Sequence, residues 1–228
     1  MQNVFSIAID GPSGAGKSSV ARAVAEKLGA MYLDTGAMYR AVGLYMLKNG
    51  VPLDDPAAIA AHCMDVDVRV GYGKDGQQCV YLGEEDVSEA IRAAEVSLAA
   101  SSVSTVLAVR ERMVALQREI AKGHSVVMDG RDIGTKVLPN ATLKVFLTAS
   151  AEVRAQRRFE ELARKGMPEP YDKVLEELIR RDEIDTHRAA SPLRKAEDAV
   201  EVDCSRMTLE EVVQKVSSLA QQVLEAKA

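Results

Sequence analysis

The sequence has no long hydrophobic run, and nowhere does it reach the roughly 18 apolar residues that a membrane-spanning helix needs. Its first apolar run ends at Asp10 and has no basic stretch before it, so we expect no signal peptide. The three cysteines, Cys63, Cys79 and Cys204, are too scattered for a metal-binding spacing or a disulfide framework. We therefore expect a reduced, cytoplasmic protein that does not contact a membrane.

An excess of positive charge is also missing. The sequence has 29 Lys and Arg against 34 Asp and Glu, a net charge of −5, which disfavours broad nucleic-acid binding. Its 228 residues, 47% apolar and 28% charged, are typical of one large globular domain or of a core with small insertions. No surplus amphipathic segment points to an interface, so we expect a monomer.

Strand and helix patterns alternate along the chain, which predicts a parallel sheet covered by helices on both faces. The expected strands are 4–9, 31–33, 125–128, 143–147 and 199–202. The expected helices are 17–28, 37–48, 105–122, 151–164, 171–189 and 209–224. Either Asp34 or Thr35 can cap the second helix. Residues 66–82 alternate with period two around a Gly-rich turn, which predicts a small antiparallel β insertion.

The strongest motif is Gly-Pro-Ser-Gly-Ala-Gly-Lys-Ser at residues 11–18, which matches the P-loop pattern G-x-x-x-x-G-K-[ST]. It follows an expected strand and opens an expected helix, as a P-loop does. Backbone N–H groups in such a loop converge on phosphate oxygens, while the lysine reaches the β- and γ-phosphates. The N-K-x-D and D-x-x-G motifs of GTPase switches are missing from the sequence. The sequence therefore predicts an enzyme that phosphorylates a small acceptor.

Arginines supply candidate partners for an anionic acceptor. Arg40 follows an expected strand end, where open α/β sheets bind ligands, although a surface arginine would look the same. Arg154, Arg157 and Arg158 share one helical face and either surround an anion or pair with nearby glutamates.

Two further patterns allow two interpretations each. Arg181, Asp185 and Arg188 also share one helical face. The face could be functional, but the spacing alone favours a simple intrahelical ion pair between Arg181 and Asp185. Asp129 ends an apolar strand as a magnesium-binding aspartate does, and Asp132 could accept from the amine of cytosine. Both aspartates could instead cap turns.

Taken together, these segments closely resemble bacterial cytidylate kinases over essentially the whole chain. The motifs that carry the resemblance are Gly-Pro-Ser-Gly-Ala-Gly-Lys (11–17), Asp-Thr-Gly-Ala-Met-Tyr-Arg (34–40), Val-Ser-Glu-Ala-Ile-Arg (87–92), Asp-Gly-Arg-Asp-Ile-Gly-Thr (129–135) and Arg-Asp-Glu-Ile-Asp-Thr-His-Arg (181–188). Thr35 departs from the serine of many relatives but keeps the hydroxyl. After the P-loop lysine, many relatives have a glycine followed by a residue with a hydroxyl. Here Ser18 and Ser19 both carry a hydroxyl, so either of them could be the magnesium ligand.

The resemblance implies an α/β nucleoside-monophosphate-kinase fold with a five-stranded parallel sheet. It implies a core of residues 1–34, 104–150 and 171–228, a monophosphate-binding insertion of 35–103 and a lid of 151–170. It also implies transfer of the γ-phosphoryl group of ATP to CMP or dCMP, with Mg²⁺. Another small-molecule P-loop kinase or a nucleotide-dependent switch protein is the alternative.

Site residues carried over from the resemblance fall into four groups. Those expected to bind ATP are Gly11, Pro12, Ser13, Gly14, Ala15, Gly16, Lys17, Ser18, Ser19 and Arg157. Those expected to bind CMP are Thr35, Tyr39, Arg40, Ser101, Arg110, Asp129, Gly130, Arg131, Asp132, Arg181, Asp185 and Arg188. The expected catalytic residues are Lys17, Arg131, Arg154 and Arg158. The expected magnesium ligands are Ser18 and Asp129, directly or through water.

Overall fold

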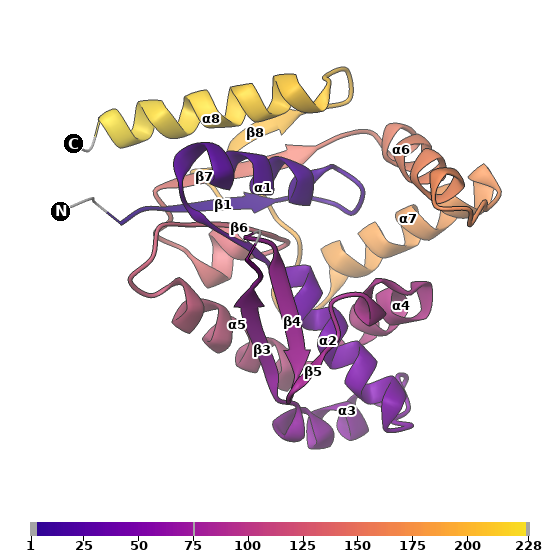
Figure 1. Ribbon diagram of the computed structural model, residues 1–228. Helices are drawn as coiled ribbons and strands as arrows, with labels where there is room; N and C mark the ends of the chain where they lie inside the picture. Colours follow the sequence, from indigo (N-terminus) through magenta and orange to yellow (C-terminus); the bar gives the residue numbers. More distant parts are fainter. Residues whose placement is uncertain (1–3, 75, 227–228) are drawn as a thin grey trace. The chain divides into compact units, whose positions relative to one another are not determined.

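A computed structural model describes residues 4–74 and 76–226, which divide into two compact units (Figure 1). The first unit is built from two separate stretches of the chain, Met1–Tyr32 and Gly123–Ala228. The second is the continuous stretch Leu33–Lys122 between them. The predicted division into core, insertion and lid concerns function, and it stays a prediction.

The first unit holds the five-stranded sheet, in the order β2-β6-β1-β7-β8, except for the last two residues of β2. Strand β1 pairs in parallel with both β6 and β7, and β7 pairs in parallel with β8. The predicted α/β fold with a parallel sheet is therefore confirmed. The strands are β1 (Ser6–Asp10), β2 (Met31–Asp34), β6 (Val126–Gly130), β7 (Leu143–Thr148) and β8 (Val200–Asp203). The helices of this unit are α1 (Lys17–Leu28), α6 (Ala151–Arg164), α7 (Tyr171–His187) and α8 (Leu209–Glu225).

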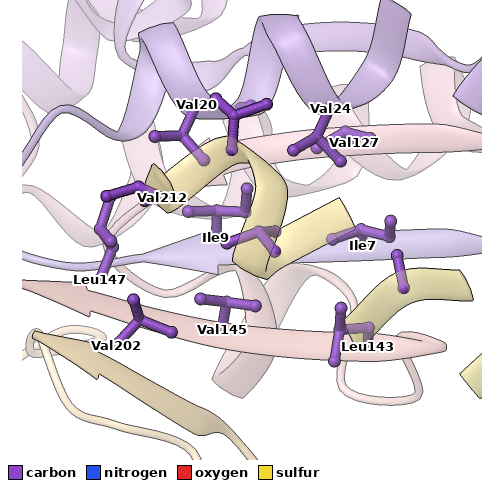
Figure 2. Close-up of a cluster of buried hydrophobic side chains, with 14 of the residues drawn as sticks. Ile7, Ile9, Val20, Val24, Val127, Leu143, Val145, Leu147, Val202 and Val212 are labelled. Carbon is purple, nitrogen blue, oxygen red and sulfur yellow. The ribbon is translucent and has the colours of Figure 1, made fainter. Parts of the chain in front are cut away.

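Helices α1 and α8 lie side by side on one face of this sheet (Figure 1). Figure 2 shows Val20 and Val24 of α1 and Val212 of α8 among Ile9 and Val145 of the central strands. All five side chains are almost completely buried. This core fixes the start of α1, where the P-loop ends, against the sheet.

Local signals in the sequence determine where several of these helices begin and end. Gly29 ends α1 in the left-handed conformation, at φ 61°. Helix α8 begins with a capping box, in which Thr208 and Glu211 each accept from the other's backbone N–H. Asp34, rather than Thr35, caps the second helix, since its carboxylate accepts from the N–H of Ala37 at 2.9 Å.

The second unit combines helices with a three-stranded antiparallel sheet, in the order β3-β4-β5. The predicted hairpin is strands β3 and β4, and β5 extends it. The strands are β3 (Val68–Tyr72), β4 (Gln78–Leu82) and β5 (Glu85–Asp86). The helices are α2 (Thr35–Lys48), α3 (Pro56–His62), α4 (Ala94–Val103) and α5 (Leu107–Ala121), with 3₁₀ turns at Cys63–Asp65 and Ala90–Arg92.

Several segments were not foreseen from the sequence. They are the helices α3 and α4, the short strand β5, the two 3₁₀ turns and a π-helical turn, Ile133–Val137, which follows β6. Within the described residues, no helix is both long and apolar enough to cross a membrane.

Candidate active site

The P-loop connects β1 to α1, and its backbone conformation requires glycine. A Cβ atom on Gly11 would lie 1.9 Å from the carbonyl oxygen of Leu147. Gly14 and Gly16 have φ angles of 77° and 89°, in the left-handed region that other residues rarely adopt. The loop runs directly into the N-terminus of α1. Its backbone N–H groups and the partial positive charge of the helix N-terminus together favour a bound anion.

Lys17 is buried at the end of this loop, and its ammonium donates to the carbonyl of Pro12 at 2.7 Å. Burial, together with the nearby charge of Arg131, lowers the pKa of Lys17 from 10.5 to about 7. The charges of Asp129, Asp185 and Asp10 oppose this shift only in part, and a bound polyphosphate would add further negative charge.

Ser18 and Asp129 bring two oxygen atoms together beside the P-loop. The Ser18 hydroxyl donates to one carboxylate oxygen of Asp129 at 2.8 Å, and the Tyr32 hydroxyl donates to the other at 2.9 Å. Ser18, and not Ser19, is therefore the P-loop hydroxyl that contacts the aspartate. Carboxylate and hydroxyl oxygens are the donors that Mg²⁺ prefers, and it usually takes one or two of them with waters and phosphates.

Asp185 lies between two arginines in the same unit. Its carboxylate accepts from Nε of Arg131 at 2.7 Å and from Nη1 of Arg188 at 3.5 Å. Burial alone would raise the pKa of Asp185, but the charges of Arg131, Arg188 and Arg181 outweigh it and hold that pKa below its usual 3.8. The cluster links the turn after β6 to α7, and it is more than an ion pair within one helix.

Asp10, which sequence reasoning missed, organises the turn that carries Asp132. Its two carboxylate oxygens accept from the N–H groups of Ile133 and Gly134, at 2.8 and 2.7 Å. Burial raises the pKa of Asp10 to about 6, against the opposing effect of these two hydrogen bonds. The available signal was an aspartate that ends a buried strand directly before the P-loop.

The arginines predicted for the lid, Arg154, Arg157 and Arg158 of α6, have different partners. Arg154 is buried, and its guanidinium donates to the carbonyls of Ser13 and Ala149. Arg157 donates to the carbonyl of Cys204 at 2.7 Å. Arg158 is partly exposed and pairs with Glu161 at 2.9 Å.

Five of the predicted CMP residues belong to the unit 33–122. Thr35 is buried in the first turn of α2. The Arg110 guanidinium lies 5.3 Å from the centre of the Tyr39 ring and donates to the carbonyl of Ser104. Ser101 donates to the backbone of its own helix. Arg40, on α2, is partly buried.

A strand, a glycine loop with a buried lysine, a helix and an aspartate at the end of a neighbouring parallel strand form the site of a P-loop phosphotransferase. The fold also resembles that of a gluconokinase from Sinorhizobium meliloti 1021, with a TM-score of 0.51 over 97% of this chain and 94% of that one, at 20% identity.

Sequence comparison gives the family. Residues 7–222 match the cytidylate kinase family, so the chain belongs to that family. It is 51% identical to the cytidylate kinase of Caldicellulosiruptor bescii over 220 residues, 96% of this chain and 97% of the other. It is 47% identical to that of Bacillus subtilis strain 168, over 97% of this chain and 99% of the other.

Proposed function

We propose that this protein transfers the γ-phosphoryl group of ATP to CMP or dCMP. The observation that carries the proposal is the largely buried cluster of Arg131, Asp185 and Arg188 in the same unit as the P-loop. Arg131 is near enough to Lys17 for its charge to lower the lysine pKa. Arg131 could thus hold an acceptor phosphate beside a donor phosphate held by Lys17.

On the donor side, the P-loop backbone and Lys17 would hold the phosphates of ATP. Ser18 and Asp129 would hold Mg²⁺, which supplies charge neutralisation at the transferring group when bound. The described residues contain no cluster of three or more metal-binding side chains, so phosphates and waters would complete the coordination. Arg157 and Arg158 would approach the donor from a lid of residues 151–170.

On the acceptor side, we propose three sets of contacts. Thr35, Arg110, Asp132 and Arg188 would contact cytosine. Ser101, Arg181 and Asp185 would contact the sugar. Arg40 and Arg131 would contact the phosphate, and Tyr39, Asp129 and Gly130 would complete the lining.

Transfer would be direct and in line, with no covalent enzyme intermediate. The acceptor phosphate is already anionic and needs no strong base to activate it. The residues therefore act by positioning and by stabilising charge, with Lys17, Arg131 and Arg158 around the transferring group. In this structure the guanidinium of Arg154 contacts the carbonyl of Ser13 in the P-loop.

Asp132 would select the base. Its carboxylate can accept from the exocyclic amine of cytosine, whereas uracil presents a carbonyl at that position. Two facing acceptors leave buried polar groups unpaired, at a cost of about 1–3 kcal/mol. CMP should therefore be preferred to UMP by about 10- to 100-fold in kcat/KM.

The test is a coupled assay of ADP formation with ATP and MgCl₂ against CMP, dCMP, UMP, AMP and GMP. Turnover with CMP and dCMP alone would support the proposal, and Asp132→Ala should remove most of the discrimination against UMP. No turnover with any of the five would overturn the acceptor assignment while leaving nucleotide binding at the P-loop intact. Equal kcat/KM for CMP and UMP would refute the role of Asp132.

A further inference from the structure

The outer side of the P-loop is held by a buried arginine from α6. The guanidinium of Arg154 donates to the carbonyls of Ser13 and Ala149, both at 2.9 Å, and pairs with the carboxylate of Asp182 at 2.7 Å. Only 5% of Arg154 is exposed. These contacts occupy all three nitrogens of the guanidinium, so Arg154 is committed to this position.

The contact with Ser13 determines how the next peptide of the loop is oriented. In a trans peptide the C=O and N–H groups point in opposite directions, and the described residues contain no cis peptide. Holding the Ser13 carbonyl against Arg154 therefore turns the N–H of Gly14 away from α6. In a P-loop, the N–H groups on the side that the loop curls around are the ones that contact phosphate.

Packing leaves this part of the loop little freedom to turn. A Cβ atom on Gly14 would lie 3.2 Å from Cβ of Arg154 and 3.7 Å from Cδ2 of Leu178. The backbone of the loop therefore rests directly on α6 and α7.

A second carbonyl of the loop is held in the same manner. The thiol of Cys204 donates to the carbonyl of Ala15 at 3.4 Å, which turns the N–H of Gly16 to the opposite side. Arg157 fixes Cys204 through its carbonyl at 2.7 Å. Side chains outside the loop thus orient two of its peptides, Ser13–Gly14 and Ala15–Gly16.

We propose that Asp182 and Arg154 act as a pair of positioning residues that hold the P-loop N–H groups ready for the donor phosphates. Asp182 supplies the negative charge that lets an arginine stay buried beside the loop. The proposal deepens the proposed function, on which it rests only for the P-loop's binding of nucleotide. It gives a task to Asp182, which lies outside every predicted contact with ATP, CMP or magnesium.

Asp182 separates this role from direct contact between Arg154 and phosphate. In the variant Asp182→Leu, the arginine loses the carboxylate that balances its charge and is held less firmly, by the carbonyls of Ser13 and Ala149 alone. If Arg154 contacted the nucleotide directly, its release would leave binding of ADP unchanged or strengthen it. If the pair positions the loop, binding should weaken by about tenfold, the effect of one misplaced charge-assisted hydrogen bond.

The measurement is calorimetric titration with ADP in the presence of MgCl₂, and separately with CMP. Asp182→Leu should raise the Kd for ADP about tenfold and change the Kd for CMP less than twofold. Glu183→Leu removes an exposed carboxylate from the same helix and should leave both constants unchanged. An unchanged or lower Kd for ADP in Asp182→Leu would overturn the proposal.

The double variant Arg154→Met/Asp182→Leu controls for stability, because it leaves no buried charge unpaired. Its melting temperature should recover toward that of the wild type, while binding of ADP stays weak. Recovery of ADP affinity along with stability would reduce the pair to a purely structural role and overturn the proposal. A wild type that binds ADP but does not phosphorylate CMP would refute only the acceptor assignment.

Discussion

Asp185 is the residue on which the cluster of Arg131, Asp185 and Arg188 depends for its charge balance. Two arginines, Arg131 and Arg188, share its carboxylate, and only 8% of Asp185 is exposed. Without this carboxylate, two guanidinium groups would lose their common negative partner. The sequence showed Arg181, Asp185 and Arg188 on one face of a helix, but it could not show Arg131 arriving from 54 residues away.

The variant Asp185→Asn should therefore lower the free energy of unfolding by about 3–5 kcal/mol at neutral pH, as for removal of one partner from a buried ion pair. The pKa of Asp185 is held below 3.8, so its contribution is present above about pH 4 and is lost as pH falls through the folded-state pKa. Urea unfolding of both proteins at several pH values measures the difference.

The pH profile distinguishes this explanation from others. The difference between the two proteins should shrink below about pH 4, where Asp185 itself becomes protonated in the wild type. Asp185 also raises the pKa of Lys17, which lies at about 7, so the difference should be somewhat larger at about pH 6 than at about pH 8. A difference that persists unchanged well below about pH 4 would point to another cause. The matched comparison for Asp185→Asn is Asp182→Asn, which neutralises a carboxylate on the same helix that pairs with Arg154 instead.

At the scale of elements, prediction succeeded where the determinants are local. The ranges 17–28 and 151–164 were predicted as helices and coincide with α1 and α6. Both are bounded by residues with strong end preferences, Gly29 after α1 and Ser150 before α6. Such signals act over a few residues and can be recognised in a single sequence.

Prediction failed where distant contacts decide the conformation. The π-helical turn Ile133–Val137 is held by the carboxylate of Asp10, more than 120 residues earlier in the chain. The dipeptide Asp55-Pro56 is typical of a turn as well as of a helix start. In the structure it starts helix α3, where Asp55 caps the helix and Pro56 is its first residue. Helix α4 is rich in alanine and serine and lacks a clear apolar period, so its burial against α2 was not visible.

The contact between α2 and α4 depends on Gly43. Replacing a glycine inside a helix by alanine normally stabilises the helix by about 1 kcal/mol. At Gly43, however, the added Cβ would lie 2.9 Å from the backbone nitrogen of Ala100 and 3.0 Å from Cβ of Ala99. We expect Gly43→Ala to lower the free energy of unfolding by about 1–3 kcal/mol, because backbone must move.

The control lies on the same helix. At Gly36 the nearest atom is the carboxylate oxygen of Asp34, at 3.2 Å, the same oxygen that caps α2 through the N–H of Ala37. Gly36→Ala should therefore cost at most about 1 kcal/mol, less than Gly43→Ala, because only this side-chain cap has to adjust. Chemical denaturation of the wild type and the two variants measures both free-energy changes. Stabilisation by Gly43→Ala would show that α4 is not packed closely against α2.

At the scale of the whole molecule, the candidate site residues are distributed over both compact units. The unit 33–122 carries Thr35, Arg40 and Arg110, and the other unit carries the P-loop and the Asp185 cluster. Fold class and P-loop were predictable, because one motif in its context defines both. The partners of individual side chains were not, because they depend on which segments pack together in three dimensions.

The P-loop lysine should lower the stability of the free protein in exchange for nucleotide binding. Lys17 is 6% exposed, and burial lowers its pKa to about 7, so its charged form is disfavoured by folding. Lys17→Met keeps the length of the side chain and removes this cost. We expect the melting temperature of the free variant to rise by about 2–4 °C, as a gain of 1 kcal/mol does in a protein of this size.

ADP should reverse this order. With ADP and MgCl₂ at about 100 times the Kd, the wild type should gain about 2.7 kcal/mol of stability, while the variant gains little because it lacks the cation for the phosphates. Differential scanning calorimetry measures both melting temperatures. Without ADP the variant should melt at a higher temperature than the wild type, and with ADP the wild type should melt at a higher temperature than the variant. Equal stabilisation of both proteins by ADP would mean that Lys17 does not contact the nucleotide, and the donor side of the site would have to be reassigned.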